Sequence, residues 1–334
     1  MSFHISIKPG TEYLMVKNNQ SILEAAKEKQ IALPHSCSNG KCAKCKCKVL
    51  SGSFEISNYS NKALTDQEKS NNIILTCKTY PLSDMVIQYD HLIDKSPSFK
   101  TIGRVISIER KTVDVIILKI KISFGERFLF KPGQYVDFLL KNGEKRSYSI
   151  ANSPFIDQYL EFHIKHFFGG LFTDQLFGLT NIHLKEDDIL RLEGPFGSFI
   201  LQEKSKNPII FLASGTGFAP IKSMMEYIIR ENIFSQPIYL YWGARKLSDI
   251  YMNDLAKSWE SLIVNFKYRP VLINEISESM VNIPEYVMKD FKDLSSFQIY
   301  ACGSNIMIES AKRDFITKCR LPVNKFYSDA FIST

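Results

Sequence analysis

The sequence predicts a multidomain chain of α+β and α/β class, in which a β-grasp module, an antiparallel β-barrel and a parallel-sheet α/β domain follow one another. Three observations predict this order. Cysteines crowd one loop between short alternating segments in residues 1–92. Short β-rich runs separated by Gly, Pro and Asn turns fill residues 99–203, which is typical of an antiparallel barrel. Apolar strands followed by amphipathic stretches fill residues 204–334, which indicates a parallel sheet covered by helices.

The first module begins with two alternating segments that predict a hairpin around Pro9-Gly10. A loop with several cysteines and further short strands follow, and the polar segment around Pro97 is typical of a linker. Two capping boxes predict helix starts, because a Ser or Thr followed three residues later by Glu can satisfy the first backbone N–H groups of a helix. These pairs are Ser21 with Glu24 and Thr65 with Glu68.

The cysteine loop predicts a metal centre. Cys37, Cys42 and Cys45 have C-x4-C-x2-C spacing, and Cys77 follows after a gap that suits a fourth ligand. Four thiolates in this arrangement can hold a 2Fe-2S cluster. Gly40 helps the loop wrap tightly, because glycine reaches backbone angles that are closed to other residues.

Two other readings of these cysteines are a disulfide framework and a zinc site. Disulfide frameworks are typical of small secreted chains, whereas this chain has 334 residues and no secretory leader is indicated. A zinc site usually takes two C-x2-C hairpins, whereas the second half of this metal site would be a single cysteine, Cys77. Cys47 is expected to pack in a strand. Four lysines around the loop indicate either a docking face for an acidic partner or a solvated surface: Lys41, Lys44, Lys46 and Lys48.

The predicted barrel carries residues suited to a dinucleotide that contains a flavin. Alternation along a strand places Arg146 and Tyr148 on one face and Ser149 on the other. An arginine can clamp a pyrophosphate, and an aromatic ring can stack on an isoalloxazine. The Gly169-Gly170 turn, which leads into a helix, can offer backbone N–H groups to phosphate, although such a pair is also common as a plain turn. The segment 193–199 is expected to be a tight loop that closes the barrel.

The last domain places glycine-bearing turns at the carboxyl ends of three predicted strands, where ligands bind parallel sheets. The first holds Gly215, Thr216 and Gly217, but Pro220 replaces the third glycine of a full dinucleotide fingerprint. A proline is tolerated in the first helical turn, so a phosphate site is still compatible. The second turn is 242–245, and the third contains Cys302 and Gly303. Cys302 could face a nicotinamide or simply pack in the core.

Composition and charge argue against a membrane-spanning protein and against a nucleic-acid-binding protein. The chain is 45% hydrophobic and 23% charged, and it has no run of 18 apolar residues, so the sequence predicts an ordinary soluble protein without a membrane span. The cytoplasm is the expected location. The formal net charge of +7 is spread along the chain and not concentrated in a basic stripe, so no nucleic-acid partner is expected.

The combination of these motifs in this order resembles the ferredoxin-NADP reductase superfamily, in the group that carries a 2Fe-2S ferredoxin domain at the N-terminus. That group includes reductases of ring-hydroxylating dioxygenases and of methane monooxygenase, and the CDP-6-deoxy-3,4-glucoseen reductases of deoxysugar biosynthesis. The resemblance covers essentially the whole chain. The stretches RSYSIAN, EGPFGSF, FLASGTGFAPIKSM, YACGSN and KFYSDAF look most like the deoxysugar reductases.

The resemblance implies FAD in the barrel and a nicotinamide dinucleotide, NADH with NADPH as an alternative, in the last domain. It implies that Arg146 contacts the FAD pyrophosphate, that Tyr148 stacks on the flavin and that Ser149 lies near the flavin N5. The remaining implied residues hold phosphate (Gly170, Thr173), lie under or beside the dinucleotide (Gly215, Thr216, Gly217, Cys302) or shield the flavin (Phe331). For Phe331, packing into the domain is the alternative. Arg245 could recognise a 2'-phosphate.

The implied function is electron transfer from NAD(P)H through FAD and the 2Fe-2S cluster to a partner protein. FAD is needed between them, because a nicotinamide delivers two electrons as hydride and the cluster accepts one at a time. In the deoxysugar family the acceptor is a pyridoxamine-phosphate CDP-sugar dehydrase. One alternative is an aromatic-ring dioxygenase or another oxygenase as acceptor. A non-catalytic metal-binding module is the other, and it predicts a colourless protein with zinc and no flavin.

Overall fold

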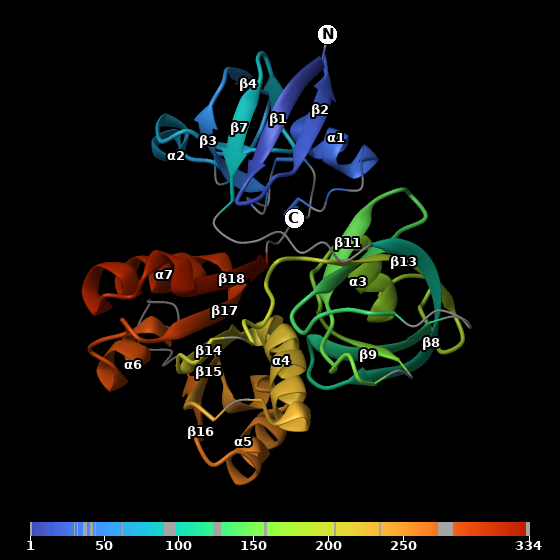
Figure 1. The fold of residues 1–334 in the computed structure, drawn as a ribbon. Coiled ribbons are helices and arrows are strands. Elements are labelled where there is room, and N and C mark those ends of the chain that lie inside the picture. Colours follow the sequence, from blue (N-terminus) through green and yellow to red (C-terminus); the bar gives the residue numbers. More distant parts are fainter. Residues whose placement is uncertain are drawn as a thin grey trace. The chain divides into compact units, whose positions relative to one another are not determined.

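The chain forms two compact units in this computed structural model (Figure 1). The first unit is Met1–Phe99 together with Gly194–Ser198, and the second is Lys100–Glu193 together with Phe199–Ser333. Apart from Phe99 and Gly194–Ser198, the residues described for the predicted barrel and parallel-sheet domains fall in the second unit, and the boundaries at 99–203 and 204–334 remain predictions. The structure describes residues 2–29, 31, 33–35, 39–40, 43, 45–61, 63–89, 98–122, 128–156, 159–203, 205–233, 235–272 and 283–331.

The first unit contains a five-stranded sheet in the order β2-β1-β7-β3-β5. The predicted hairpin is confirmed, since β1 pairs antiparallel with β2, and β1 also pairs parallel with β7. Both predicted capping boxes are present at the starts of α1 and α2. Alternate residues of β1 and β2 are buried and form a core with the buried side chains of α1. The elements are β1 (Ser2–Lys8), β2 (Tyr13–Lys17), α1 (Ile22–Glu28), β3 (Lys46–Ser51), β4 (Phe54–Ile56), α2 (Asp66–Ser70), β5 (Ile73–Leu75), β6 (Thr79–Pro81) and β7 (Met85–Gln88).

The second unit begins with a six-stranded sheet in the order β11-β10-β13-β8-β9-β12. Ile150, next to the end of β11, bridges Phe162 of β12, so the two outermost strands also approach each other. The expected loop at 193–199 is wrong in part, because β13 continues through Phe196. The elements are β8 (Phe99–Arg110), β9 (Val115–Ile122), β10 (Tyr135–Leu139), β11 (Lys145–Ser149), β12 (Leu160–Lys165), α3 (Leu171–Leu176) and β13 (Ile189–Phe196).

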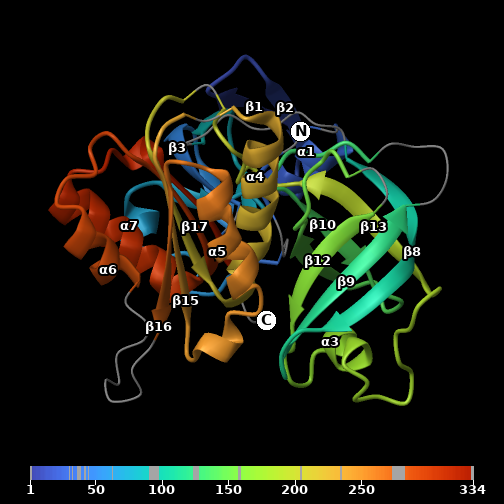
Figure 2. The ribbon, with the colours of Figure 1, turned by 90° about the horizontal axis from the view of Figure 1, so that it is seen from below.

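The rest of the second unit is a parallel sheet in the order β16-β15-β14-β17-β18. Helices α4 and α5 cover one face and α6 and α7 the other (Figure 2). The sequence analysis did not identify β16, α6 or β18. The elements are β14 (Ile209–Ser214), the 3-10 turn Gly215–Gly217, α4 (Phe218–Glu231), β15 (Ile238–Ala244), α5 (Asn253–Leu262), β16 (Phe266–Leu272), α6 (Ile283–Asp290), β17 (Gln298–Ser304), α7 (Asn305–Cys319) and β18 (Phe326–Phe331).

Among the described helices, none combines the length and the apolar character needed to cross a bilayer.

Candidate functional site

Two of the four predicted cluster ligands lie side by side. The Sγ atoms of Cys45 and Cys77 are 3.2 Å apart, and both residues are buried. This separation is longer than the S–S bond of about 2.05 Å in a disulfide. It is close to the roughly 3.8 Å expected for two thiolates on one tetrahedral metal with bonds of about 2.3 Å. The pair therefore fits two ligands of a single metal ion, while Cys37 and Cys42 lie outside the described residues.

Backbone hydrogen bonds fix this pair. The N–H and the hydroxyl of Thr76 both donate to the carbonyl of Cys45, at 3.1 and 3.3 Å. The turn that carries Cys77 is closed by the N–H of Lys78, which donates to the Leu75 carbonyl at 2.8 Å. Because Thr76 precedes Cys77 in the chain, these bonds tie the third predicted ligand to the segment that carries the fourth.

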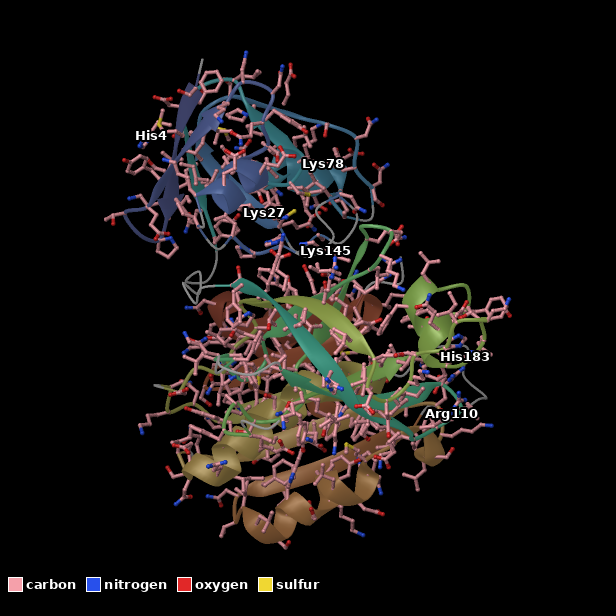
Figure 3. The ribbon with its side chains drawn as sticks, turned by 90° about the vertical axis from the view of Figure 1, so that its right-hand side faces the viewer. His4, Lys27, Lys78, Arg110, Lys145 and His183 are labelled. Atoms are coloured by element: carbon pink, nitrogen blue, oxygen red, sulfur yellow. The ribbon has the colours of Figure 1, made fainter. Side chains whose placement is uncertain are left out.

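Gly40 is required where the cysteine loop approaches this turn. Its φ is +80°, and a Cβ there would lie 2.9 Å from Cγ of Lys78, a residue labelled in Figure 3, and 3.1 Å from Cβ of Tyr59. The prediction that Gly40 supplies special backbone freedom is thus supported by a positive φ and a close approach. Cys47 is buried in the core of the first unit, and burial raises the pKa of its thiol well above its usual value. Cys47 therefore packs, as predicted.

The two segments predicted to bind FAD meet through aromatic side chains. Tyr148 on β11 lies with its ring centroid 5.0 Å from that of Phe138 and 5.7 Å from that of Phe172 on α3. Phe138 and Phe172 also contact each other, at 5.2 Å. Phe172 immediately precedes Thr173, so the strand with Tyr148 and the Gly-Gly turn are brought together.

Arg146 on β11 is half-buried and held by its neighbours. Its guanidinium donates to the Glu144 carboxylate at 2.6 Å and to the Lys145 carbonyl at 3.0 Å. The hydrogen bond from Arg146 lowers the pKa of Glu144. Lys145, also labelled in Figure 3, pairs with Glu193 at 2.5 Å. Arg146 therefore has a single described carboxylate partner at the surface, an arrangement that can exchange that partner for a phosphate.

The Gly169-Gly170 turn depends on its two glycines for different reasons. Gly169 has φ +78°, which favours glycine. A Cβ on Gly170 would lie 2.5 Å from the Thr173 hydroxyl and 2.9 Å from the Phe167 carbonyl oxygen. The Thr173 hydroxyl itself donates to the Phe167 carbonyl at 2.9 Å. In this structure Thr173 thus holds the turn in shape.

A pocket of about 310 Å³ lies at the carboxyl ends of the parallel strands. Gly215 lines it, and residues of the first sheet of the second unit close one side. The sequence analysis placed the glycine-bearing segments that hold Gly215, Gly243 to Arg245 and Ser304 at this edge, but it missed the lining residues from the first sheet, because its loops gave no signal. The lining residues that come from strand ends and loops are Asp114, Val115, Lys165, Ser214, Gly215, Gly243, Ala244, Arg245, Asp249 and Ser304.

Close backbone contacts fix the predicted nicotinamide turns to each other. A Cβ on Gly217 would lie 2.1 Å from the Cys302 carbonyl oxygen, and a Cβ on Gly303 would lie 2.5 Å from the hydroxyl of Ser214. The Ser304 N–H donates to that hydroxyl at 2.9 Å. The structure therefore brings the first and third glycine turns together, as the fold prediction required.

The remaining predicted residues lie near this edge or in the neighbouring sheet. Phe331 pairs with Ser304 at the end of β18 and packs partly against the core. Cys302 is fully buried, and Thr216 is nearly so. Ser149 ends β11 opposite Tyr135 and is buried.

Arg245 lies between two carboxylates at the mouth of the pocket. Its guanidinium is 4.0 Å from Asp114 and 4.0 Å from Asp249, and its side chain is 70% exposed. Burial would raise the pKa of Asp114, but a hydrogen bond from Thr112 and the charges of Lys165 and Arg245 lower it. The two carboxylates place negative charge beside Arg245, which would repel a phosphate that approaches it.

Three family models match successive parts of the chain. They are the 2Fe-2S iron-sulfur cluster binding domain over residues 5–82, the oxidoreductase FAD-binding domain over 103–200 and the oxidoreductase NAD-binding domain over 211–313. The CDP-6-deoxy-L-threo-D-glycero-4-hexulose-3-dehydrase reductase of Yersinia pseudotuberculosis is 35% identical over 99% of both chains. The chain belongs to the ferredoxin-NADP reductase superfamily, in the group with an N-terminal 2Fe-2S domain.

Other similar proteins are named for different enzymes. The reductase component of propane 2-monooxygenase from Mycolicibacterium goodii is 30% identical over 99% of this chain and 98% of that one. The cytochrome P450 reductase GcoB from Amycolatopsis has the same fold, with a TM-score of 0.76, 24% identity and 98% coverage of both chains.

This reductase transfers electrons from NAD(P)H through FAD and a 2Fe-2S cluster to a partner enzyme. The FAD- and NAD-binding matches remove the alternative of a non-catalytic metal-binding module. The adjacent Cys45 and Cys77 thiols and the pocket at the parallel strand ends fit the cluster and the dinucleotide respectively.

Proposed function

We propose that the electron acceptor of this reductase is a CDP-6-deoxyhexulose 3-dehydrase. The observation that carries this proposal is the full-length similarity to reductases named for that dehydrase, at 35% identity and 99% coverage. A reductase with this acceptor would serve deoxysugar biosynthesis, and we keep the cytoplasm as its predicted location.

We propose that Cys37, Cys42, Cys45 and Cys77 hold the cluster. The short distance between the Cys45 and Cys77 sulfurs supports their binding the same iron. Cys37 and Cys42 would then bind the second iron, because each iron of a 2Fe-2S cluster takes two protein thiolates.

We propose that FAD binds in the first sheet of the second unit, closed into a barrel near Ile150. Arg146 would pair with the pyrophosphate in place of Glu144, Tyr148 would stack on the flavin ring, and Gly169, Gly170 and Thr173 would shape the phosphate turn. Ser149 would donate a hydrogen bond near the flavin N5. The cluster of Tyr148 with Phe138 and Phe172 supports this placement, because it presents an aromatic platform beside the turn.

We propose that the nicotinamide dinucleotide lies in the pocket at the ends of β14, β15 and β17. Gly215, Thr216 and Gly217 would lie beneath it, Cys302 and Gly303 beside the nicotinamide, and Phe331 over the flavin. The surroundings of Gly215 and Gly217 support this, since the space beside Gly215 is open, and the missing Cβ of Gly217 lets the turn lie against the Cys302 carbonyl. Asp249 and Asp114 beside Arg245 would repel a 2'-phosphate, so NADH is the proposed donor and NADPH the alternative.

The chain's own residues have four tasks in this mechanism. Bound FAD would supply the chemistry that links a two-electron hydride donor to a one-electron acceptor. The turn at Gly215–Gly217 would orient the donor, Arg146 would retain the flavin nucleotide, and the buried Ser149 and Cys302 would lie beside the reacting groups. Aromatic side chains exclude water around Tyr148. No acid-base residue for sugar chemistry is needed, because that chemistry belongs to the acceptor.

Anaerobic NADH oxidation with a CDP-sugar dehydrase and CDP-4-keto-6-deoxyglucose tests the acceptor, with the sugar product scored by mass. A 3,6-dideoxy product that requires both proteins would support the proposal. NADH oxidation with ferricyanide but no deoxygenated sugar would contradict it.

The second candidate acceptor is an oxygenase. The similarity to the propane 2-monooxygenase reductase, which also covers nearly the whole chain, favours it. An oxygenase that accelerates NADH oxidation by this reductase and gives hydroxylated product would identify this class instead.

A further inference from the structure

A buried network of charged and polar side chains joins β12 to α4 and α5 within the second unit. Glu161 and His163 lie on β12, Lys222 and Glu226 on α4, and Tyr251 two residues before the start of α5. The side chains of Glu161, His163 and Lys222 are no more than 6% exposed. Since burial of charge is costly unless each charge is paired, this arrangement calls for an explanation.

Every ion in the network has a close partner. Lys222 lies 3.0 Å from Glu161 and 2.6 Å from Glu226. Burial would lower the pKa of Lys222, but the two carboxylates raise it, so the lysine stays charged. Burial would raise the pKa of Glu161, but the hydrogen bond with His163 and the charge of Lys222 lower it to about 2. The Glu226 carboxylate also accepts from the Ser153 N–H at 3.1 Å.

The hydrogen bonds that join Glu161, His163 and Tyr251 have a fixed donor and acceptor at each step. Burial lowers the pKa of His163, so its imidazole is neutral and carries one proton. His163 Nε2 lies 3.0 Å from the Glu161 carboxylate, which only accepts, so Nε2 donates. Nδ1 must then accept from the Tyr251 hydroxyl, 2.8 Å away. Burial, with repulsion from Glu161 and Cys302, raises the pKa of Tyr251 and keeps its proton in place.

The ring of Tyr251 connects these hydrogen bonds to the glycine turn through Trp242. It packs edge-on against Trp242, with centroids 5.2 Å apart and planes at 87°. Trp242 stacks on Phe218, the first residue of α4, at 3.8 Å, and its indole N–H donates to the Gly215 carbonyl at 3.1 Å. A continuous series of contacts therefore leads from strand β12 to the turn Gly215–Gly217.

We propose that His163 and Tyr251 are positioning residues for hydride transfer, which act through Trp242 to fix the Gly215–Gly217 turn relative to β12. This inference rests on the proposed placement of the nicotinamide dinucleotide at that turn. Positioning is worth much here, because a misplacement of about 1 Å can slow a reaction roughly 10²-fold. The series of residues Glu161, His163, Tyr251 and Trp242 is called the positioning relay below.

The test uses the holoprotein with Tyr251→Phe, which removes one hydroxyl and keeps the ring packed. Tyr241→Phe is the matched control, because it removes a tyrosine hydroxyl that bonds Asp290 at 2.6 Å on the opposite face of the sheet. The first measurement is solvent exchange of the indole N–H groups by NMR. The chain has two tryptophans, so Trp259 is an internal reference for Trp242.

For Tyr251→Phe we expect faster exchange at Trp242 than in the parent protein, with Trp259 unchanged. The rate constant for anaerobic flavin bleaching by NADH should fall about tenfold, with the Kd for NAD+ changed less than twofold. Tyr241→Phe should show neither change. His163→Asn keeps an acceptor for Tyr251 and should stay nearer the parent rate than His163→Leu.

Unchanged exchange at Trp242 in Tyr251→Phe would overturn the positioning relay. Faster exchange with an unchanged bleaching rate would overturn its role in hydride transfer. A parent protein whose flavin is bleached by neither NADH nor NADPH would instead reject the proposed function, so the two failures are distinguishable.

Discussion

Replacement of Gly217 by alanine tests the close approach between the first and third glycine turns. The added Cβ would lie 2.1 Å from the Cys302 carbonyl oxygen and 2.8 Å from the Gly303 nitrogen. Ordinary contact begins at 3.4 Å, so one backbone segment must move by about 1.3 Å. Both neighbours are backbone atoms of β17 and cannot rotate away. Overpacking of this kind costs about 1–3 kcal/mol.

The movement would displace the turn from the end of β17, and the predicted loss in the rate of flavin reduction by NADH is on the order of 10²-fold. Anaerobic stopped-flow absorbance measures this rate, and calorimetry measures the fall in Tm. Gly103→Ala is the control, because its Cβ would clash at 2.3 Å with Ile120 on the first sheet of the second unit. If Gly217→Ala loses stability like Gly103→Ala yet keeps the parent reduction rate, the proposed nicotinamide site is wrong.

Three further substitutions test other parts of the site. Cys42→Ser should lose the cluster, seen by iron content and visible absorbance, and should keep ferricyanide reduction through FAD; loss of that activity with FAD still bound would reject the carrier order. Arg146→Ala should reduce the FAD retained after dialysis by about tenfold, at little cost in Tm, because its described partners are at the surface; unchanged flavin content, as expected for the control Arg104→Ala, would contradict its role. Asp249→Asn should raise kcat/KM for NADPH relative to NADH several-fold, because a negative charge 4.0 Å from Arg245 is removed; an unchanged ratio would show that Asp249 does not discriminate.

The sequence predicted the elements whose signals are local. The capping box at Ser21 and Glu24 and the hairpin around Pro9-Gly10 appear as predicted, because each depends on residues within a few positions. The alternation of β14, β15 and β17 with helices along the chain was also predictable, since apolar runs alternate with amphipathic ones. The strands β16 and β18 were missed because edge strands are half-exposed and lack a continuous apolar run.

The glycine turns could be predicted from the sequence, but the residues that contact them and the other lining residues of the pocket could not. Gly215 and Gly217 stand out in the sequence because they follow a buried strand, and Gly303 because it lies at the end of one. The contact of Gly217 with the Cys302 carbonyl depends on the pairing of β14 with β17, which are nearly ninety residues apart in the chain. Asp114 directly precedes β9 and Lys165 ends β12 in the neighbouring sheet, so nothing in their own surroundings marked them as lining residues of the pocket.

The ion pairs of Lys222 with Glu161 and Glu226, next to the positioning relay, explain why α4 has a lysine where its apolar face meets β12. Apolar side chains of suitable volume would fill this space at no cost in desolvation, and they are often as stable as a buried ion pair. They would also tolerate a small shift of α4 along β12, because dispersion contacts have little direction. Lys222 held between Glu161 and Glu226 does not tolerate such a shift, since a charge left without its partner costs about 3–5 kcal/mol. Lys222 is only one helical turn beyond Phe218, so the ions fix the helix at the end that carries the glycine turn.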